Sequence, residues 1–244
     1  MLDTASEFVR TSREGGIAVV AIERPPVNAI NNQVRDELAR VFAEMEEDAG
    51  VRCIVLTGGP LMFSAGVDIR GLHAAAAADA VPRNRRYQAT FLAIARSRAP
   101  VLAAINGYAL GGGLELAMAC DLRVAASDAF RALPEINRGG MPGAAGPQRL
   151  ARLAGKGRAI RMVTSGDRIS AEEAYRIGLV QELAGPGQAI DRALDIGRLI
   201  ASKLARAAEA CKFAISLGAD LPPETAYAIN LLEQANWPST VSSR

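Results

Sequence analysis

The stretch Val101-Leu-Ala-Ala-Ile-Asn-Gly-Tyr-Ala-Leu-Gly-Gly-Gly-Leu-Glu-Leu-Ala117 decides the fold class of this chain. Its first five residues are apolar and predict a buried strand that ends at Asn106-Gly107. Three consecutive glycines then precede a helix predicted over residues 114–120, and residues 121–125 return as a strand. Strand, helix and strand in this order predict an α/β fold with turns of a repeated ββα unit.

Apolar periodicity predicts further elements on both sides of this stretch. Residues 17–22 and 52–57 predict short strands, and residues 31–48 and 85–98 predict helices, separated by an alanine-rich loop tip at 74–79. Helices are also predicted over 188–203, 206–217 and 223–234. Since no low-complexity linker precedes these last helices, we expect a main domain over residues 1–185 and a helical region over 186–244 that does not fold independently.

A helix start is also predicted at Ser170, because Ser170 and Glu173 have the spacing of a capping box. In this motif the serine oxygen accepts a hydrogen bond from the third amide of the helix, and the glutamate reaches back to the serine amide.

The composition is that of a globular protein without an electrostatic footprint. Half of the residues are hydrophobic, 22% are charged, and the formal net charge is only +2. We therefore expect no nucleic-acid partner and no membrane partner. The first residues lack the pattern of a signal peptide, and the three scattered cysteines are typical of buried thiols in a reducing compartment, which predicts a cytoplasmic protein.

Glu115 and Glu135 are the candidates for acid–base chemistry. Gly111 to Gly113 begin the helix that carries Glu115, and free N–H groups at a helix start favour developing negative charge. Glu135 follows Pro134, ahead of another glycine-rich turn. An acidic residue at a helix start also stabilises the helix by about 0.3–1 kcal/mol, so each glutamate alone has a structural explanation. Sequence spacing does not show that the two carboxylates meet.

Other catalytic classes lack the residues that they need. The only histidine is His73, beside the predicted loop tip, and Ser64 does not stand in a Gly-x-Ser-x-Gly elbow. No His/Cys cluster predicts a metal site, and Gly155-Lys156-Gly157 lacks the flanking residues of a phosphate loop. An acid–base pair must therefore come from carboxylates.

Four segments in combination resemble the crotonase (enoyl-CoA hydratase/isomerase) superfamily. Residues 105–117 are similar to its main signature, and Phe63-Ser-Ala-Gly-Val-Asp-Ile69 resembles its acyl-CoA-binding loop. Leu133-Pro-Glu-Ile136 resembles its second signature, and residues 166–180 continue the match. The resemblance runs from about residue 15 to 185. It implies a crotonase-like spiral of ββα units, with a C-terminal helical region for trimerisation and closure of the CoA site.

The resemblance also implies a role for each matching residue. The backbone N–H groups of Ala65 and Gly112 correspond to the oxyanion hole for the thioester oxygen. Glu115 and Glu135 fall on the two glutamates that add water, in a syn manner, across the 2,3 double bond of a 2-enoyl-CoA. The implied substrate- and CoA-binding residues are Val27, Ala29, Ala65, Gly66, Val67, Asp68, Ile69, Gly111, Gly112 and Pro134. No metal or separate cofactor is implied, since coenzyme A is part of the acyl-CoA substrate, and the expected assembly is a homotrimer or hexamer.

Two alternatives to hydration stay open. Isomerases that resemble this family commonly lack one of the two glutamates, so retaining both favours hydration over Δ3,Δ2-enoyl-CoA isomerisation. A non-catalytic protein that binds acyl-CoA is the other alternative. The segment from His73 to Arg86 and the tail are expected to shape the acyl pocket, and neither encodes the acyl chain length in a recognisable way.

The chain departs from the family pattern at three places. Arg131 stands where an apolar or aromatic residue is usual, and we expect it to alter the pocket or the pKa of Glu135. Ala145 and Pro147 replace a glycine and a threonine, which is expected to stiffen that turn. Residues 237–244 lack the helix that usually closes such chains.

Overall fold

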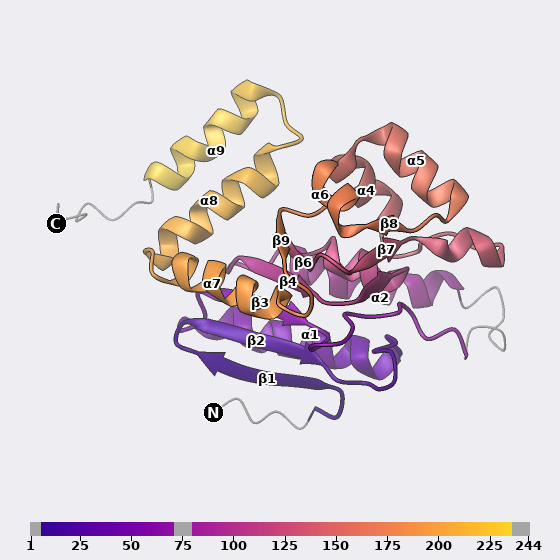
Figure 1. Cartoon of the computed structure of the whole chain (residues 1–244). Helices are drawn as coiled ribbons and strands as arrows, with labels where there is room; N and C mark the ends of the chain where they lie inside the picture. The colour runs from indigo at the N-terminus through magenta and orange to yellow at the C-terminus, as the bar shows by residue number, and fades with distance from the viewer. Residues whose placement is uncertain (1–5, 71–79, 236–244) are drawn as a thin grey trace.

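Two β-sheets organise the chain in the computed structural model, which describes residues 6–70 and 80–235 (Figure 1). The loop tip predicted at 74–79, His73 and residues 237–244 lie outside the described residues. A six-stranded sheet has the order β1-β2-β3-β4-β6-β9, and a three-stranded sheet has the order β5-β7-β8. The strands are β1 Val9–Glu14, β2 Ile17–Ile22, β3 Cys53–Thr57, β4 Val101–Ile105, β5 Tyr108–Leu110, β6 Leu122–Ala126, β7 Phe130–Ala132, β8 Ile169–Ser170 and β9 Glu182–Ala184.

Helices connect the strands, and one of them, α7 Ala189–Ala201, packs along the larger sheet. The helices are α1 Asn32–Glu47, α2 Ala80–Ala95, α3 Gly112–Ala117, the 3-10 helix η2 Pro134–Arg138, α4 Gly146–Ala154, α5 Lys156–Ser165, α6 Ala171–Arg176, α7 Ala189–Ala201, α8 Ala205–Gly218 and α9 Pro223–Ala235.

Successive turns of the chain stack as a spiral. β2, β3, β4, β6 and β9 pair in parallel, and only β1 joins this sheet antiparallel. After each long strand the chain crosses to a second row, in which Ile30 bridges Val67, Ser64 bridges Ala109, and β5 pairs in parallel with β7. Each turn thus gives one segment to each row before its helix, which confirms the predicted ββα spiral.

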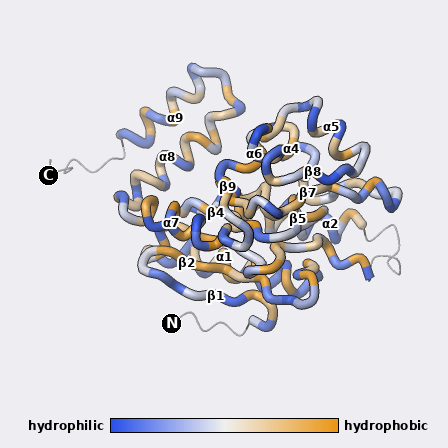
Figure 2. Tube along the Cα trace, viewed as in Figure 1, coloured by the Kyte–Doolittle hydropathy of each residue, from blue (hydrophilic) through white to orange (hydrophobic). Residues whose placement is uncertain are grey.

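The central strands β3 and β4 of the six-stranded sheet are largely apolar and buried on both faces, whereas the edge strand β1 is mostly polar and exposed. Ile54 and Leu56 of β3 belong to the core that includes α1 and α2, whereas Cys53 and Val55 belong to the core under α7. This alternation explains the continuous apolar runs in the sequence, since strands of a covered parallel sheet need no polar face. Hydrophobic residues accordingly follow β2 in Figure 2.

The helical region expected from residue 186 begins with a helix of the main body. α7 packs on β2, β3, β4 and β6, and its Ala189 and Ala193 are fully buried in the sheet core. The hairpin of α8 and α9 instead extends away from the sheets (Figure 1), and each of its helices buries a single residue, Ala210 and Ile229. The domain boundary at residue 185 stays a prediction, and α7, which follows it, packs on the core of the main domain.

The predicted start of α6 is half right. The Ser170 hydroxyl accepts a hydrogen bond from the Glu173 amide at 3.2 Å, as a capping serine does. The Glu173 carboxylate does not complete the box, because it pairs with Arg176 one turn along the helix, at 2.6 Å. An ion pair between residues i and i+3 has replaced the second half of the motif.

No helix in the described ranges combines the length and the apolar character needed to span a membrane.

Candidate active site

A cavity of about 290 Å³ lies where the second row of the spiral meets α2, α3 and η2. It brings together most of the residues singled out from the sequence, which come from the loop after β3, the start of α3 and η2. These are Ala65, Gly66, Val67, Ile69, Gly111, Gly112, Glu115, Pro134 and Glu135.

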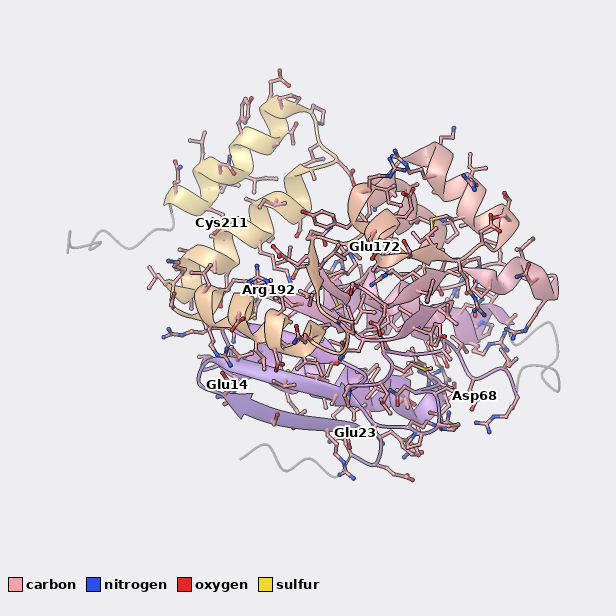
Figure 3. The ribbon with its side chains drawn as sticks, viewed as in Figure 1. Glu14, Glu23, Asp68, Glu172, Arg192 and Cys211 are labelled. Carbon is pink, nitrogen blue, oxygen red and sulfur yellow. The ribbon has the colours of Figure 1, made fainter. Side chains whose placement is uncertain are left out.

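Three predicted substrate-binding residues are not among the described residues that line this cavity. Val27 accepts a hydrogen bond from the Ala65 amide, and the Ala29 carbonyl accepts one from the Arg24 guanidinium. Asp68, labelled in Figure 3, pairs with Arg24 at 2.9 Å and with Arg70 at 2.8 Å. These ion pairs hold the pKa of Asp68 well below its usual range, so its carboxylate stays ionised and paired with the two arginines.

The two glutamates meet because they follow neighbouring parallel strands. Leu110 at the end of β5 lies opposite Ala132 at the end of β7, and the Gly111 amide donates to the Ala132 carbonyl at 2.9 Å. α3 and η2 therefore begin at the same edge of the small sheet. Gly111 has a φ of +52°, and a Cβ at this position would lie 2.9 Å from Oε1 of Glu135. Glycine therefore suits this position, both for its backbone conformation and for the space beside Glu135.

Glu115 is buried and fixed by backbone amides. Its side chain is part of a residue only 2% exposed, and its Oε1 accepts hydrogen bonds from the amides of Ala144 and Gly146, both at 2.8 Å. Burial raises the pKa of Glu115, and the two amides and the charge of Arg149 oppose that rise. The amides stabilise the carboxylate form and fix its orientation, as expected for a general base.

Glu135 is half-buried and has far fewer partners. Its Oε2 is buried without a hydrogen-bond partner among the described residues. Burial and, to a smaller extent, the Glu115 carboxyl raise the pKa of Glu135, its own amide and Arg138 lower it, and the net result is a pKa of about 7. The pair thus consists of one carboxylate stabilised by amides and one carboxyl that is readily protonated near neutral pH, a combination suited to acid–base catalysis.

The two backbone amides predicted for the oxyanion hole differ in whether they already donate a hydrogen bond. Gly112 is the first residue of α3, where amides have no acceptor within the helix. The Ala65 amide already donates to the Val27 carbonyl, at 3.0 Å. A ligand oxygen that binds both amides must therefore share or displace that bond.

Arg131 does not act on Glu135 as expected. Arg131 is fully buried on β7, and its Nη1 donates to the Ala129 carbonyl at 3.3 Å, while Nε and Nη2 have no described partner. Burial lowers the pKa of Arg131 and the charge of Glu172, labelled in Figure 3, opposes this, with a net pKa of about 10. The cation whose charge lowers the pKa of Glu135 is Arg138, whereas the carboxyl that acts on Arg131 is Glu172.

Several lining residues were not predicted individually. Arg83, Asn84 and Tyr87 come from the first turns of α2, and Arg138, Met141 and Gly143 come from η2 and the turn after it. The segment from His73 to Arg86 was expected to shape the acyl pocket, but nothing in its pattern separates Arg83 from Arg85. The amides of Ala144 and Gly146 carry no side-chain signal at all.

Known proteins of one family are similar to this chain along nearly its whole length. The family model for enoyl-CoA hydratase/isomerase matches residues 12–243. A short-chain-enoyl-CoA hydratase of Clostridium acetobutylicum is 38% identical over 218 residues, 88% of this chain and 84% of the relative. A crotonyl-CoA hydratase of Syntrophomonas wolfei is 39% identical over 82% of this chain and 77% of its own length.

The solved structures agree with the sequence relatives. The crystal structure of an enoyl-CoA hydratase from Bacillus anthracis superposes with a TM-score of 0.91 at 32% identity, covering 94% of this chain and 90% of that one. With the two carboxylates, the glycine-rich helix start and the spiral in place, the chain belongs to the enoyl-CoA hydratase/isomerase family.

Proposed function

We propose that this protein hydrates 2-enoyl-CoA thioesters, with Glu115 as the base and Glu135 as the acid. The observation that carries the proposal is the unequal environment of two carboxyl groups in one cavity. Oε1 of Glu115 accepts two amide hydrogen bonds, whereas Oε2 of Glu135 accepts none from the described residues. Two titratable groups whose surroundings push their pKa values apart are the usual basis of an acid–base assignment.

The reaction follows from this pairing. A water molecule between the carboxyls gives a proton to Glu115 as its oxygen bonds to C3, and Glu135 gives its proton to C2. One water is added across the double bond, and the proton gained by Glu115 restores Glu135 before the next turnover. Negative charge that develops on the thioester oxygen is stabilised by the amides of Gly112 and Ala65. Loss of one such donor costs about 2.7–4 kcal/mol in other enzymes.

The remaining expectations belong to the same proposal. The backbone around Val27, Ala29 and Asp68 lines the path of the CoA portion, outside the cavity that holds the reacting atoms. No separate cofactor is required, since coenzyme A enters with the substrate, and the enzyme works in the cytoplasm. The names of the two relatives, a short-chain and a crotonyl-CoA hydratase, support a short acyl chain.

The test follows the loss of the enoyl thioester absorbance with crotonyl-CoA and the purified protein. Glu115→Gln and Glu135→Gln are each expected to lower kcat by about 100- to 10,000-fold, the contribution of one positioned acid or base. Glu47→Gln, an exposed change on α1, is the matched control and keeps the parent rate. Near-parent activity in either active-site variant would contradict the two-carboxylate mechanism.

Isomerisation is distinguished in the same assay. A Δ3,Δ2-isomerase moves a proton between C2 and C4 and converts 3-enoyl-CoA faster than it hydrates the 2-enoyl ester. A higher kcat/KM for 3-enoyl-CoA than for the 2-enoyl ester would therefore show that isomerisation, not hydration, is the main activity. Tight binding of acyl-CoA without turnover would instead support a non-catalytic binding protein.

A further inference from the structure

The first turn of α2 gives the cavity a wall that is rich in hydrogen-bond donors. Arg83 and Asn84 both line the cavity and are half-buried, and Arg138 faces the same space from η2. The Asn84 side chain packs against Gly143, since a Cβ on that glycine would lie 2.8 Å from Nδ2 of Asn84. Gly143 directly precedes the Ala144 amide that binds Glu115, so this donor-rich wall adjoins the catalytic carboxylates.

Arg83 has no described partner for its charge. Within the described ranges, no hydrogen bond or ion pair joins Arg83 or Arg138 to another residue, whereas Arg24 pairs with Asp68 and Arg35 pairs with Asp36. Arg35 and Arg83 both act on Tyr87, whose pKa burial raises and these two charges lower. Of the two guanidiniums beside Tyr87, only Arg35 thus has an acidic partner.

The acyl chain must reach this wall if the proposed hydration is correct, and the inference rests on that function. With the thioester oxygen at Gly112 and C2 and C3 between the glutamates, C4 and later atoms extend into the remaining part of the cavity. An alkyl chain there would remove water from Arg83 without replacing its hydrogen bonds, which is costly for a charged group. A carboxylate instead fits the planar fork of a guanidinium.

We propose that the preferred substrate is a short 2-enoyl-CoA whose acyl chain ends in a carboxylate, bound by Arg83 with Arg138 and Asn84 as further donors. The cavity of about 290 Å³ limits the length of that chain, since it is at the small end of ligand sites. Within the described residues neither catalytic carboxyl is paired with Arg83: Oε1 of Glu115 accepts two backbone amides, and the cation that lowers the pKa of Glu135 is Arg138.

The experiment compares matched thioesters with the purified full chain. One is a six-carbon trans-2-enoyl-CoA ending in a carboxylate, the second is its methyl ester, and the third is crotonyl-CoA. We expect kcat/KM for the acid to exceed that of its methyl ester by about 10- to 100-fold, the range of one hydrogen-bonded charged group. Arg83→Gln should remove most of this preference, and Arg83→Lys should retain part of it.

Arg85→Gln is the matched control, since Arg85 is exposed two residues further along the same helix and does not line the cavity. It should leave the preference for the acid unchanged. The inference is overturned if the methyl ester is used as well as the acid. It is also overturned if Arg83→Gln lowers kcat/KM equally for all three esters, because Arg83 would then bind the CoA portion that they share.

Equilibrium binding of the saturated acid and its saturated methyl ester, both as CoA thioesters, separates this inference from the proposed hydration. A preference for the saturated acid without turnover of any enoyl ester would contradict hydration and leave the carboxylate pocket standing. Turnover of crotonyl-CoA with no preference in binding or in kcat/KM would contradict the pocket alone.

Discussion

Two fully buried arginines, Arg131 and Arg123, differ in how their N–H groups are satisfied. Arg123 donates from Nε to the Leu179 carbonyl at 2.6 Å, from Nη1 to the Cys120 carbonyl at 2.8 Å, and from Nη2 to Gln181. Arg131 makes one bond, at 3.3 Å, and leaves two nitrogens without a described partner. A buried charge is costly unless its hydrogen bonds are made, so the two side chains should affect stability in opposite directions.

Replacing each of these arginines with methionine tests that contrast. Arg131→Met removes a buried guanidinium with two unsatisfied nitrogens and should leave the free energy of unfolding unchanged or raise it by about 1–3 kcal/mol. Arg123→Met leaves buried carbonyls without donors and should lower it by about 3 kcal/mol or more. Thermal unfolding measures both, and a large loss of stability in Arg131→Met would show that its charge has a partner that it needs.

Glu135 should make the stability of the protein depend on pH. Burial raises the pKa of its carboxyl from 4.5 to about 7, so the folded protein binds this proton more tightly than the unfolded chain does. The stabilisation is complete below pH 4.5 and is lost as the pH rises through 7. Glu135→Gln cannot ionise, so its Tm should be near that of the parent at pH 5 and higher than that of the parent at pH 8.5. The corresponding gain in the free energy of unfolding at pH 8.5 is about 1–3 kcal/mol at most. An equal difference at both pH values would contradict the raised pKa.

At the level of single elements, the turn before α4 combines catalytic support with backbone strain. Ala145 has a φ of +72°, in the left-handed region that costs a non-glycine residue about 1–2 kcal/mol. Its neighbours Ala144 and Gly146 supply the amides that bind Glu115. The sequence predicted a stiff turn here, with Ala145 in the place of a glycine, and the structure adds that this alanine keeps a left-handed backbone.

Ala145→Gly should relieve this strain. Because glycine also gains entropy in the unfolded chain, the net gain is expected to be at most about 1 kcal/mol, or a rise in Tm of about 2–4 °C. Ala144→Gly is the matched control: its φ is not positive, so the same change should lower Tm. Differential scanning calorimetry of the two variants decides, and a lower Tm in Ala145→Gly would show that the turn is not strained.

The elements that the sequence predicted are those with a strong apolar signal. β2, β3 and β4 coincide with the expected strands because a parallel sheet covered on both faces needs continuous apolar runs. α2 begins five residues before the expected 85, at Ala80. β5, β7 and β9 have only three residues each, too few to show any period, and α4 and α5, of nine and ten residues with a glycine in the first turn, were not predicted.

At the scale of the whole molecule, the proximity of the two glutamates could not be predicted from their spacing in the sequence. Twenty residues separate Glu115 from Glu135, and each follows a three-residue strand that has no pattern of its own. Their proximity comes from the spiral, which places β5 beside β7. Resemblance to the family implied the pair, and the cavity with its unequal carboxyls supplies the physical reason for it.

The α8–α9 hairpin is attached to the rest of the molecule mainly through charged groups. Lys212 of α8 pairs with Asp121 at 2.7 Å and donates to the Ala99 carbonyl at 3.0 Å, and Glu209 pairs with Arg98. Apolar side chains of the hairpin remain exposed, among them Phe213, Ile215, Leu217, Tyr227, Leu231 and Leu232. Figure 2 shows hydrophobic positions along both helices. Several exposed apolar side chains on one hairpin are typical of a contact between subunits.

The expected trimer or hexamer should therefore depend on this hairpin. Tyr227 and Leu231 are four residues apart on one face of α9 and are 64% and 66% exposed, so their combined replacement by aspartate would place two charges in a subunit contact. Light scattering after size exclusion should give the mass of three or six chains for the parent and a smaller mass for the double variant. Ile160→Asp, a similarly exposed position on α5 away from the hairpin (Figure 1), should keep the parent mass. A monomeric parent, or a double variant that assembles normally, would mean that the apolar face of the hairpin does not form the contact between subunits.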